Sequence, residues 1–157
     1  MPERLMVFVC SGNVCRSPMA EYLLRQRLGA ESGWRVISAG VSAGAGMSAS
    51  DAAVTALDEM DIDLRPHRSR PVTKELVQEA SMLVVMTVTH YEQMKALFPD
   101  VAGRVYLLKS FNPAAEGTDI TDPIGSSVDF YREIRDEINA ALPGLVKYMK
   151  TFKDEDD

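Results

Sequence analysis

The chain has 157 residues, of which 46% are hydrophobic and 25% charged, and a formal net charge of -6. This length fits a single domain with one core, and the composition excludes a disordered or membrane-spanning class. The negative charge argues against general nucleic-acid binding, because most of the surface would repel phosphate groups. We therefore expect a cytoplasmic monomer with no nucleic-acid or membrane partner, which must bind any anionic substrate through a local positive site.

Apolar runs of strand length alternate along the chain with amphipathic stretches of helix length, a pattern typical of a parallel sheet covered on both faces. Strands are predicted over residues 5–9, 34–38, 82–86 and 105–108, and helices over residues 18–28, 50–60, 73–80, 89–97 and 127–150. Ser50 and Thr73 are good N-caps, and Pro18 suits a first helical position. Pro143 lies inside the last predicted helix and should kink or split it.

These elements predict an α/β fold: a three-layer sandwich in which a small four-stranded parallel sheet is flanked by helices, with a phosphate-binding loop after the first strand. A single domain is expected over residues 1–153. An acidic tail is expected over residues 154–157, solvated and without a fixed structure.

Residues 10–17 read CSGNVCRS and join the first predicted strand to the first predicted helix. Such a loop points backbone N–H groups into one space, and the helix dipole adds positive potential there. Gly12 and Asn13 tolerate the left-handed backbone angles that an anion-binding loop requires. Arg16 can direct two donors at phosphate oxygens, and Cys10 lies in the same field, which favours its thiolate form. The segment is therefore predicted to bind phosphate and to attack it through Cys10.

The longer segment VFVCSGNVCRSPMAE, residues 7–21, resembles the signature of the low-molecular-weight protein tyrosine phosphatase family, and the chain's length and element order fit that family. Later segments also fit: Ser38-Ala39-Gly40, His67 in an HRSRP sequence, and Asp122-Pro123. The resemblance implies that the catalytic residues are Cys10, Arg16 and Asp122. It implies substrate binding by Ser11, Gly12, Asn13, Val14, Cys15 and Ser17, and loop support from Ser38 and His67, with no metal and no cofactor.

The movement of charge and protons in the reaction then predicts a mechanism. The thiolate attacks phosphorus, and the leaving group departs poorly as an anion, so a carboxylic acid must protonate it; Asp122 takes that role. The resulting phosphocysteine is hydrolysed by a water that the same carboxylate activates. Chemistry alone does not select Asp122, because Glu116, Asp119 and Asp129 lie nearby and an Asp-Pro pair also suits an ordinary turn.

Two interpretations of Cys15 are possible. It is either a small buried hydrophobic residue or the partner of Cys10 in a reversible disulfide that protects an oxidised nucleophile. The sequence leaves both open.

Two positions give opposite indications about the substrate. Ile124 and Gly125 stand where tyrosine-specific members carry an aromatic pair, and the stretch DPIGSS resembles the bacterial protein-arginine phosphatase branch. That branch carries threonine where this chain has Val14, an aliphatic residue similar to that of the tyrosine-specific members. Because Val14 should line the cavity directly, we predict a phosphotyrosine phosphatase, with phosphoarginine as the alternative.

Two further classes are less favoured. Arsenate reductases share this loop and fold, but they need cysteines downstream to pass a disulfide along, and none follows Cys15. A phosphoprotein-binding module without catalytic activity would lack the nucleophile, the arginine or the acid, whereas the sequence has all three.

Overall fold

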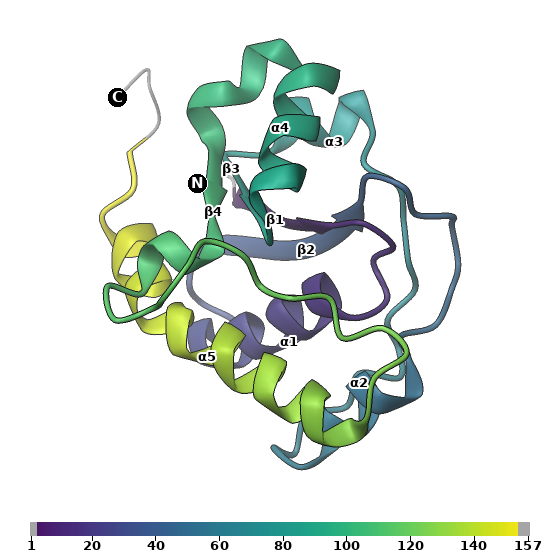
Figure 1. The fold of residues 1–157 in the computed structure, drawn as a ribbon. Coiled ribbons are helices and arrows are strands. Elements are labelled where there is room, and N and C mark those ends of the chain that lie inside the picture. The colour runs from purple at the N-terminus through teal and green to yellow at the C-terminus, as the bar shows by residue number, and fades with distance from the viewer. Residues whose placement is uncertain (1–2, 154–157) are drawn as a thin grey trace.

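A parallel sheet of four strands, in the order β2-β1-β3-β4, lies at the centre of the computed structural model, which describes residues 3–153 (Figure 1). The strands are β1 (Arg4–Cys10), β2 (Trp34–Gly40), β3 (Met82–Val85) and β4 (Val105–Leu107). Each contains most of a predicted strand, and the pairing is parallel throughout. The predicted acidic tail at 154–157 lies outside the described residues.

Helices cover both faces of the sheet, so the predicted three-layer α/β sandwich is confirmed (Figure 1). One layer holds α1 (Arg16–Leu28), α2 (Asp51–Asp58) and α5 (Val128–Lys150), and the other holds α3 (Lys74–Glu79) and α4 (Val88–Leu97). Two short 3-10 helices, η1 (Pro99–Arg104) and η2 (Leu108–Phe111), flank β4. Alternate residues of β1 face the two layers, since Met6 and Phe8 belong to one apolar cluster and Val7 and Val9 to the other.

Both N-caps predicted from the sequence are correct. Ser50 accepts a hydrogen bond from the N–H of Ala53, and Thr73 accepts one from the N–H of Leu76. The start predicted at Pro18 is wrong, because α1 begins at Arg16. The N–H of Met19 already bonds to the carbonyl of Cys15 at 3.2 Å, so the chain turns helical directly after the loop.

Pro143 does not split the last helix, so that part of the prediction is wrong. The helix α5 runs unbroken from Val128 to Lys150 with Pro143 inside it. Leu142 and Leu145, on either side of the proline, are both fully buried. Burial of two such side chains stabilises the helix by about 3–6 kcal/mol, which offsets the roughly 3 kcal/mol that an internal proline costs.

The carboxyl ends of β1 and β2 bring residues 10–17 against the end of the second strand. There the carbonyl of Ser11 accepts from the N–H of Ser42 at 3.0 Å. Gly40 permits this approach, because a Cβ at that position would lie 2.4 Å from the Ser11 carbonyl oxygen. The absence of a side chain at Gly40 is therefore what allows the loop to lie against the sheet edge.

Candidate active site

Residues 10–17 form a short loop that starts at the last residue of β1, Cys10, and leads into α1 at Arg16. Asn13 adopts the expected left-handed backbone, with φ at 59°. Gly12 does not have a positive φ, so its expected conformation is wrong. Asn13 is also fully buried, which means that its polar side chain must find its hydrogen-bond partners inside the protein.

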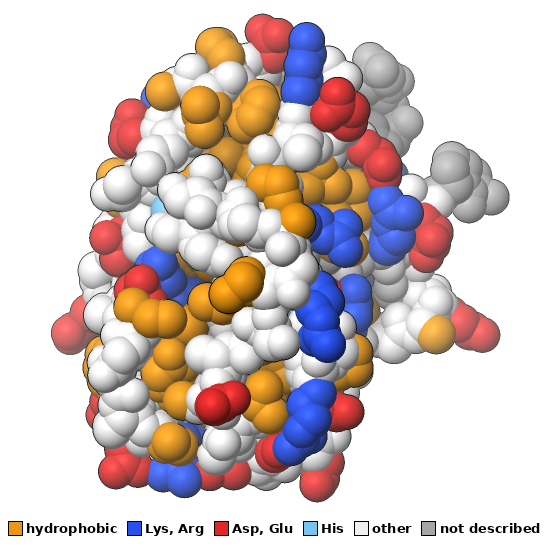
Figure 2. Space-filling view, turned by 90° about the vertical axis from the view of Figure 1, so that its right-hand side faces the viewer, with side chains coloured by type: hydrophobic (Ala, Val, Ile, Leu, Met, Phe, Trp, Pro, Cys, Tyr) orange, Lys and Arg blue, Asp and Glu red, His pale blue; other side chains and the backbone are white. Residues whose placement is uncertain are grey.

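A cavity of about 210 Å³ opens above this loop. It is lined by Cys10, Gly12, Asn13, Val14, Cys15, Arg16, Asp122 and Ile124. Two of the residues predicted to bind substrate, Ser11 and Ser17, do not line it. On the face shown in Figure 2, most Lys and Arg side chains lie along the right-hand half, with Asp and Glu side chains around them. At the cavity itself, positive potential for an anion comes from the loop N–H groups, the start of α1 and Arg16.

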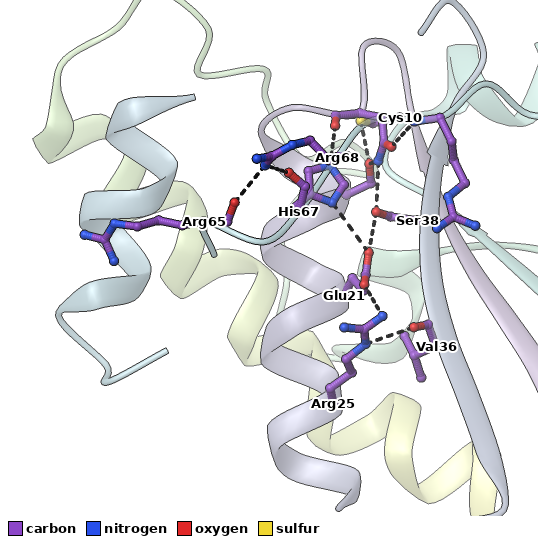
Figure 3. A network of polar contacts seen from close by, with 11 residues as sticks. Cys10, Glu21, Arg25, Val36, Ser38, Arg65, His67 and Arg68 are labelled. Atoms are coloured by element: carbon purple, nitrogen blue, oxygen red, sulfur yellow. Dashed lines mark hydrogen bonds and ion pairs between the residues drawn. The ribbon is translucent and has the colours of Figure 1, made fainter. Parts of the chain in front are cut away.

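The buried side of the loop is held by a network of hydrogen bonds (Figure 3). Cys10 Sγ lies 2.8 Å from Ser17 Oγ, and Asn13 Nδ2 donates to the hydroxyl oxygens of Ser17 and Ser38 at 2.9 Å. His67 Nε2 lies 2.8 Å from the carbonyl oxygen of Asn13. The structure thus brings together the residues predicted to support the loop, and it places the Ser17 hydroxyl against the sulfur of Cys10 rather than in the cavity.

Glu21 also belongs to this network, and sequence reasoning missed it. Its side chain is buried and accepts a hydrogen bond from Ser38 at 2.6 Å. Burial raises the pKa of the Glu21 carboxyl, while the bond from Ser38 and the charge of Arg25 oppose that shift. The only signal in the sequence was the i,i+4 spacing from Glu21 to Arg25, which is common on exposed helix faces and indicates nothing about burial.

Asp122 is the acid that faces the cavity. Its Oδ2 lies 3.6 Å from a guanidinium nitrogen of Arg16, and its side chain is 45% exposed. Its Oδ1 accepts from the N–H of Ile124 at 3.0 Å, so it is a turn residue as well. Asp119 instead accepts from the N–H of Val88 at the start of α4.

The remaining acids near Asp122 do not line the cavity. Asp129 is exposed and forms an ion pair with Arg132 on α5, and Glu116 is exposed as well. The structure therefore separates Asp122 from the three other acids that chemistry alone left open, because only Asp122 among the four lines the cavity.

Ser11 is held from α4 by His90, a second residue that sequence reasoning missed. Ser11 Oγ lies 2.8 Å from His90 Nε2, and His90 is buried. Burial lowers the pKa of His90 from 6.5 to about 4, and the positive charge of Arg16 adds to the effect. Two ordinary helix residues, Thr89 and Tyr91, flank His90 in the sequence, so its burial was not readable from its neighbours.

We expect this buried histidine to make stability depend on pH. The folded protein keeps His90 neutral, while the unfolded chain takes up a proton as the pH falls below 6.5. The free energy of unfolding should therefore decrease between pH 6.5 and about 4, by at most about 3 kcal/mol, and this contribution should be fully present above pH 6.5. Urea unfolding at a series of pH values checks it, and a His90→Gln variant with the same pH dependence would contradict it.

Cys15 lies beside the cavity as a protonated, buried thiol. Its sulfur donates to Ser50 Oγ at 3.4 Å and lies 3.2 Å from the hydroxyl oxygen of Tyr131. Burial raises the pKa of Cys15. Burial is also the main cause that raises the pKa of Tyr131 to about 12. Cys10 and Cys15 are both free thiols here. Cys10 also lines the cavity, and it has the Ser17 hydroxyl 2.8 Å from its sulfur.

The chain is similar to known proteins over most of its length. A family model described as "Low molecular weight phosphotyrosine protein phosphatase" matches residues 5–155. The chain is 39% identical over 146 residues to a protein-arginine-phosphatase of Bacillus subtilis. This match covers 92% of this chain and 96% of that protein. It is 34% identical to the probable low molecular weight protein-tyrosine-phosphatase EpsP of Ralstonia nicotianae, with 95% of this chain and 98% of EpsP covered.

Solved structures agree with these relatives. The structure of the YwlE arginine phosphatase from Geobacillus stearothermophilus superimposes with a TM-score of 0.86 at 36% identity and covers 94% of both chains. Among the described residues, no helix is long and apolar enough to cross a membrane.

Proposed function

The chain belongs to the low molecular weight phosphotyrosine protein phosphatase family and is a protein phosphatase, and from that premise we propose that it hydrolyses phosphotyrosine in proteins through a phosphocysteine at Cys10. The observation that carries the choice of phosphotyrosine is the apolar wall of the cavity. Val14 and Ile124 line it beside Cys10 and Arg16, and an apolar wall suits an aromatic ring better than a charged guanidinium group.

In the first step, the Cys10 thiolate attacks phosphorus and the bond from phosphorus to the tyrosine oxygen breaks. Asp122, protonated at this stage, gives its proton to the departing phenolate oxygen, so neutral tyrosine leaves. Arg16 and the loop N–H groups stabilise the negative charge on the remaining phosphate oxygens. Because these donors supply the positive charge, we expect turnover without added metal.

In the second step, a water molecule attacks the phosphocysteine on the side the tyrosine has left. Asp122, now a carboxylate, takes one proton from this water while the phosphorus–sulfur bond breaks. Inorganic phosphate leaves and the Cys10 thiolate is restored. The 3.6 Å contact between Asp122 and Arg16 supports this role, since it holds the acid over the phosphate-binding position.

Phosphoarginine is the second candidate, and two observations favour it. Relatives with 38–39% identity are named protein-arginine-phosphatases. In addition, none of the eight residues that line the cavity is aromatic, so the cavity offers no ring on which a tyrosine would stack. The two candidates share Cys10, Arg16 and Asp122, and they differ in how Val14 meets the leaving group.

Replacing Val14 by Thr is the experiment that separates them. We expect the ratio of kcat/KM on phosphotyrosine peptides to kcat/KM on phosphoarginine peptides to fall about tenfold, because a hydroxyl near the leaving group pairs with a guanidinium and not with a ring edge. Val14→Ile is the matched control, since it keeps an apolar wall and should preserve the ratio. An unchanged ratio in Val14→Thr would remove the reason for ranking phosphotyrosine first.

We also propose a cytosolic location, a monomeric state and no binding to nucleic acid or membranes. Two free thiols beside one another suit a reducing compartment, and the net charge of -6 opposes binding to polyanions. Size-exclusion chromatography with light scattering tests the monomer directly.

A further inference from the structure

Arg25 lies on α1, two and a half turns past the start of the helix, and it does not line the cavity. Its guanidinium pairs with Glu21 Oε2 at 2.5 Å, and its Nε donates to the carbonyl of Val36 on β2 at 3.0 Å. The Arg25 side chain is 46% exposed, whereas that of Glu21 is 6% exposed. An exposed residue is thus attached to the buried network that ends at Cys10 (Figure 3).

The directions of the hydrogen bonds in this network can be assigned from its outer end. A carboxylate only accepts, so Ser38 must donate its single hydroxyl proton to Glu21. The oxygen of Ser38 is then the acceptor for the side-chain amide of Asn13. The oxygen end of that amide is identified by its own bond, because Asn13 Oδ1 accepts from the backbone N–H of Arg70 at 2.9 Å.

Ser17 is the last link before the nucleophile. Its oxygen accepts from Asn13 Nδ2, which leaves the single Ser17 proton for the sulfur of Cys10 at 2.8 Å. A hydroxyl that donates to sulfur stabilises the thiolate, because the charged form is the stronger acceptor. The chain of donors therefore runs in two branches from Asn13, one toward Glu21 and one toward Cys10.

An ionised Glu21 supports this arrangement from the Ser38 end, because it takes the Ser38 proton and leaves the Ser38 oxygen to accept from the amide that also donates to Ser17. Burial alone favours the protonated carboxyl and raises the pKa of Glu21, and the charge of Arg25 acts against that shift. A protonated Glu21 would become a donor, and Ser38 would no longer be obliged to donate to it.

The charged and titratable groups that face Glu21 are Arg25 and Tyr22 from α1, and His67 and Arg70 from the segment before α3. Those that line the cavity with Cys10 are Arg16, Asp122 and Cys15, and His90 faces Arg16 and Asp122 from α4.

We propose that Arg25 is a positioning residue: by holding Glu21 as a carboxylate, it keeps the hydrogen-bond chain aimed at the Cys10 thiolate. The inference rests on the proposed function only for the role of Cys10 as nucleophile. It adds an exposed residue, outside the cavity, to the groups that set the reactivity of the sulfur.

Alkylation of Cys10 by iodoacetamide tests this without any substrate. In Arg25→Met we expect alkylation near neutral pH to be about three- to tenfold slower than in the unmodified protein, with a similar fall in kcat/KM on p-nitrophenyl phosphate, as for the loss of one hydrogen bond. Mass spectrometry assigns the label to Cys10 rather than Cys15. Arg27→Met is the matched control: it removes the same charge from the same helix, and Arg27 bonds to Asn139 on α5 instead.

Further variants separate this role from a loss of folding. Arg25→Lys keeps the charge and should restore the alkylation rate to within about twofold. Glu21→Gln, which keeps the size of the side chain, should slow alkylation as Arg25→Met does, and the double variant should be no slower than the slower single variant. Equal alkylation rates in folded Arg25→Met and Arg27→Met would overturn the inference. If alkylation were slow in Arg25→Met but the unmodified protein did not hydrolyse phosphotyrosine, the proposed substrate would be rejected and the inference would stand.

Discussion

Cys10→Ser is expected to lower the rate of p-nitrophenyl phosphate hydrolysis by about 10⁴-fold or more, because it removes the nucleophile. A serine hydroxyl at this place has no neighbouring base: the side chain beside it is the Ser17 hydroxyl, and Asp122 is needed as an acid in the first step. Serine is close to cysteine in size, so the loop should keep its form and still bind phosphate. The measurement is the initial rate without added metal.

The inhibition constant of inorganic phosphate gives the control within the same variant. It should change by less than about tenfold, since the N–H groups and Arg16 remain in place. Cys15→Ser provides a second comparison, because it alters the other thiol that lines the cavity and should cost activity far less than Cys10→Ser. If Cys10→Ser retained full activity, the phosphocysteine mechanism would have to be abandoned.

The fold was predictable because local signals agreed with the burial pattern. The strands of the sheet are apolar runs, and Ser50 and Thr73 cap the helices that they were expected to cap. The errors came from effects that residue propensities do not report. The burial of Leu142 and Leu145 keeps α5 whole around Pro143, and the bond from Met19 to Cys15 starts α1 ahead of Pro18.

The site was predictable where residues are adjacent in the chain, and less so where they meet in space. The loop from Cys10 to Arg16 is readable because a strand and a helix start bracket it. Glu21 and His90 are not, because an acid in a helix and a histidine near a helix start are usually exposed, and only the fold buries them. Both approach the loop from outside it: Glu21 through Ser38, and His90 through Ser11.

Ser17 also shows that the sequence does not reveal which residues a side chain meets in space. The sequence places it in the phosphate loop, which suggests contact with the ligand. In the structure it is fully buried and points to the sulfur of Cys10 and the amide of Asn13. A residue's position in the loop therefore did not determine which side of the loop its side chain occupies.

Asp122→Asn is expected to lower kcat/KM on a phosphotyrosine peptide, which reports the first step, by about 10³-fold, within the range for loss of a general acid. Asparagine keeps the carbonyl oxygen that accepts from the N–H of Ile124, so the turn should hold, but its amide is not acidic and cannot protonate the leaving group. Asp119→Asn makes the same change in charge three residues away, at the start of α4 rather than at the cavity, and should cost little.

The dependence on the leaving group identifies the acid role of Asp122. p-Nitrophenolate is stable as an anion and needs protonation much less than phenolate does, so with this substrate the Asp122→Asn variant should lose only about tenfold to a hundredfold. The ratio of the two losses in kcat/KM is the quantity that matters, because kcat/KM excludes the hydrolysis of the phosphocysteine that both substrates share. A substitution that merely displaced Arg16, 3.6 Å from Asp122, would lower both values alike. Equal losses on the two substrates would therefore assign Asp122 to positioning Arg16 and leave the source of the proton elsewhere.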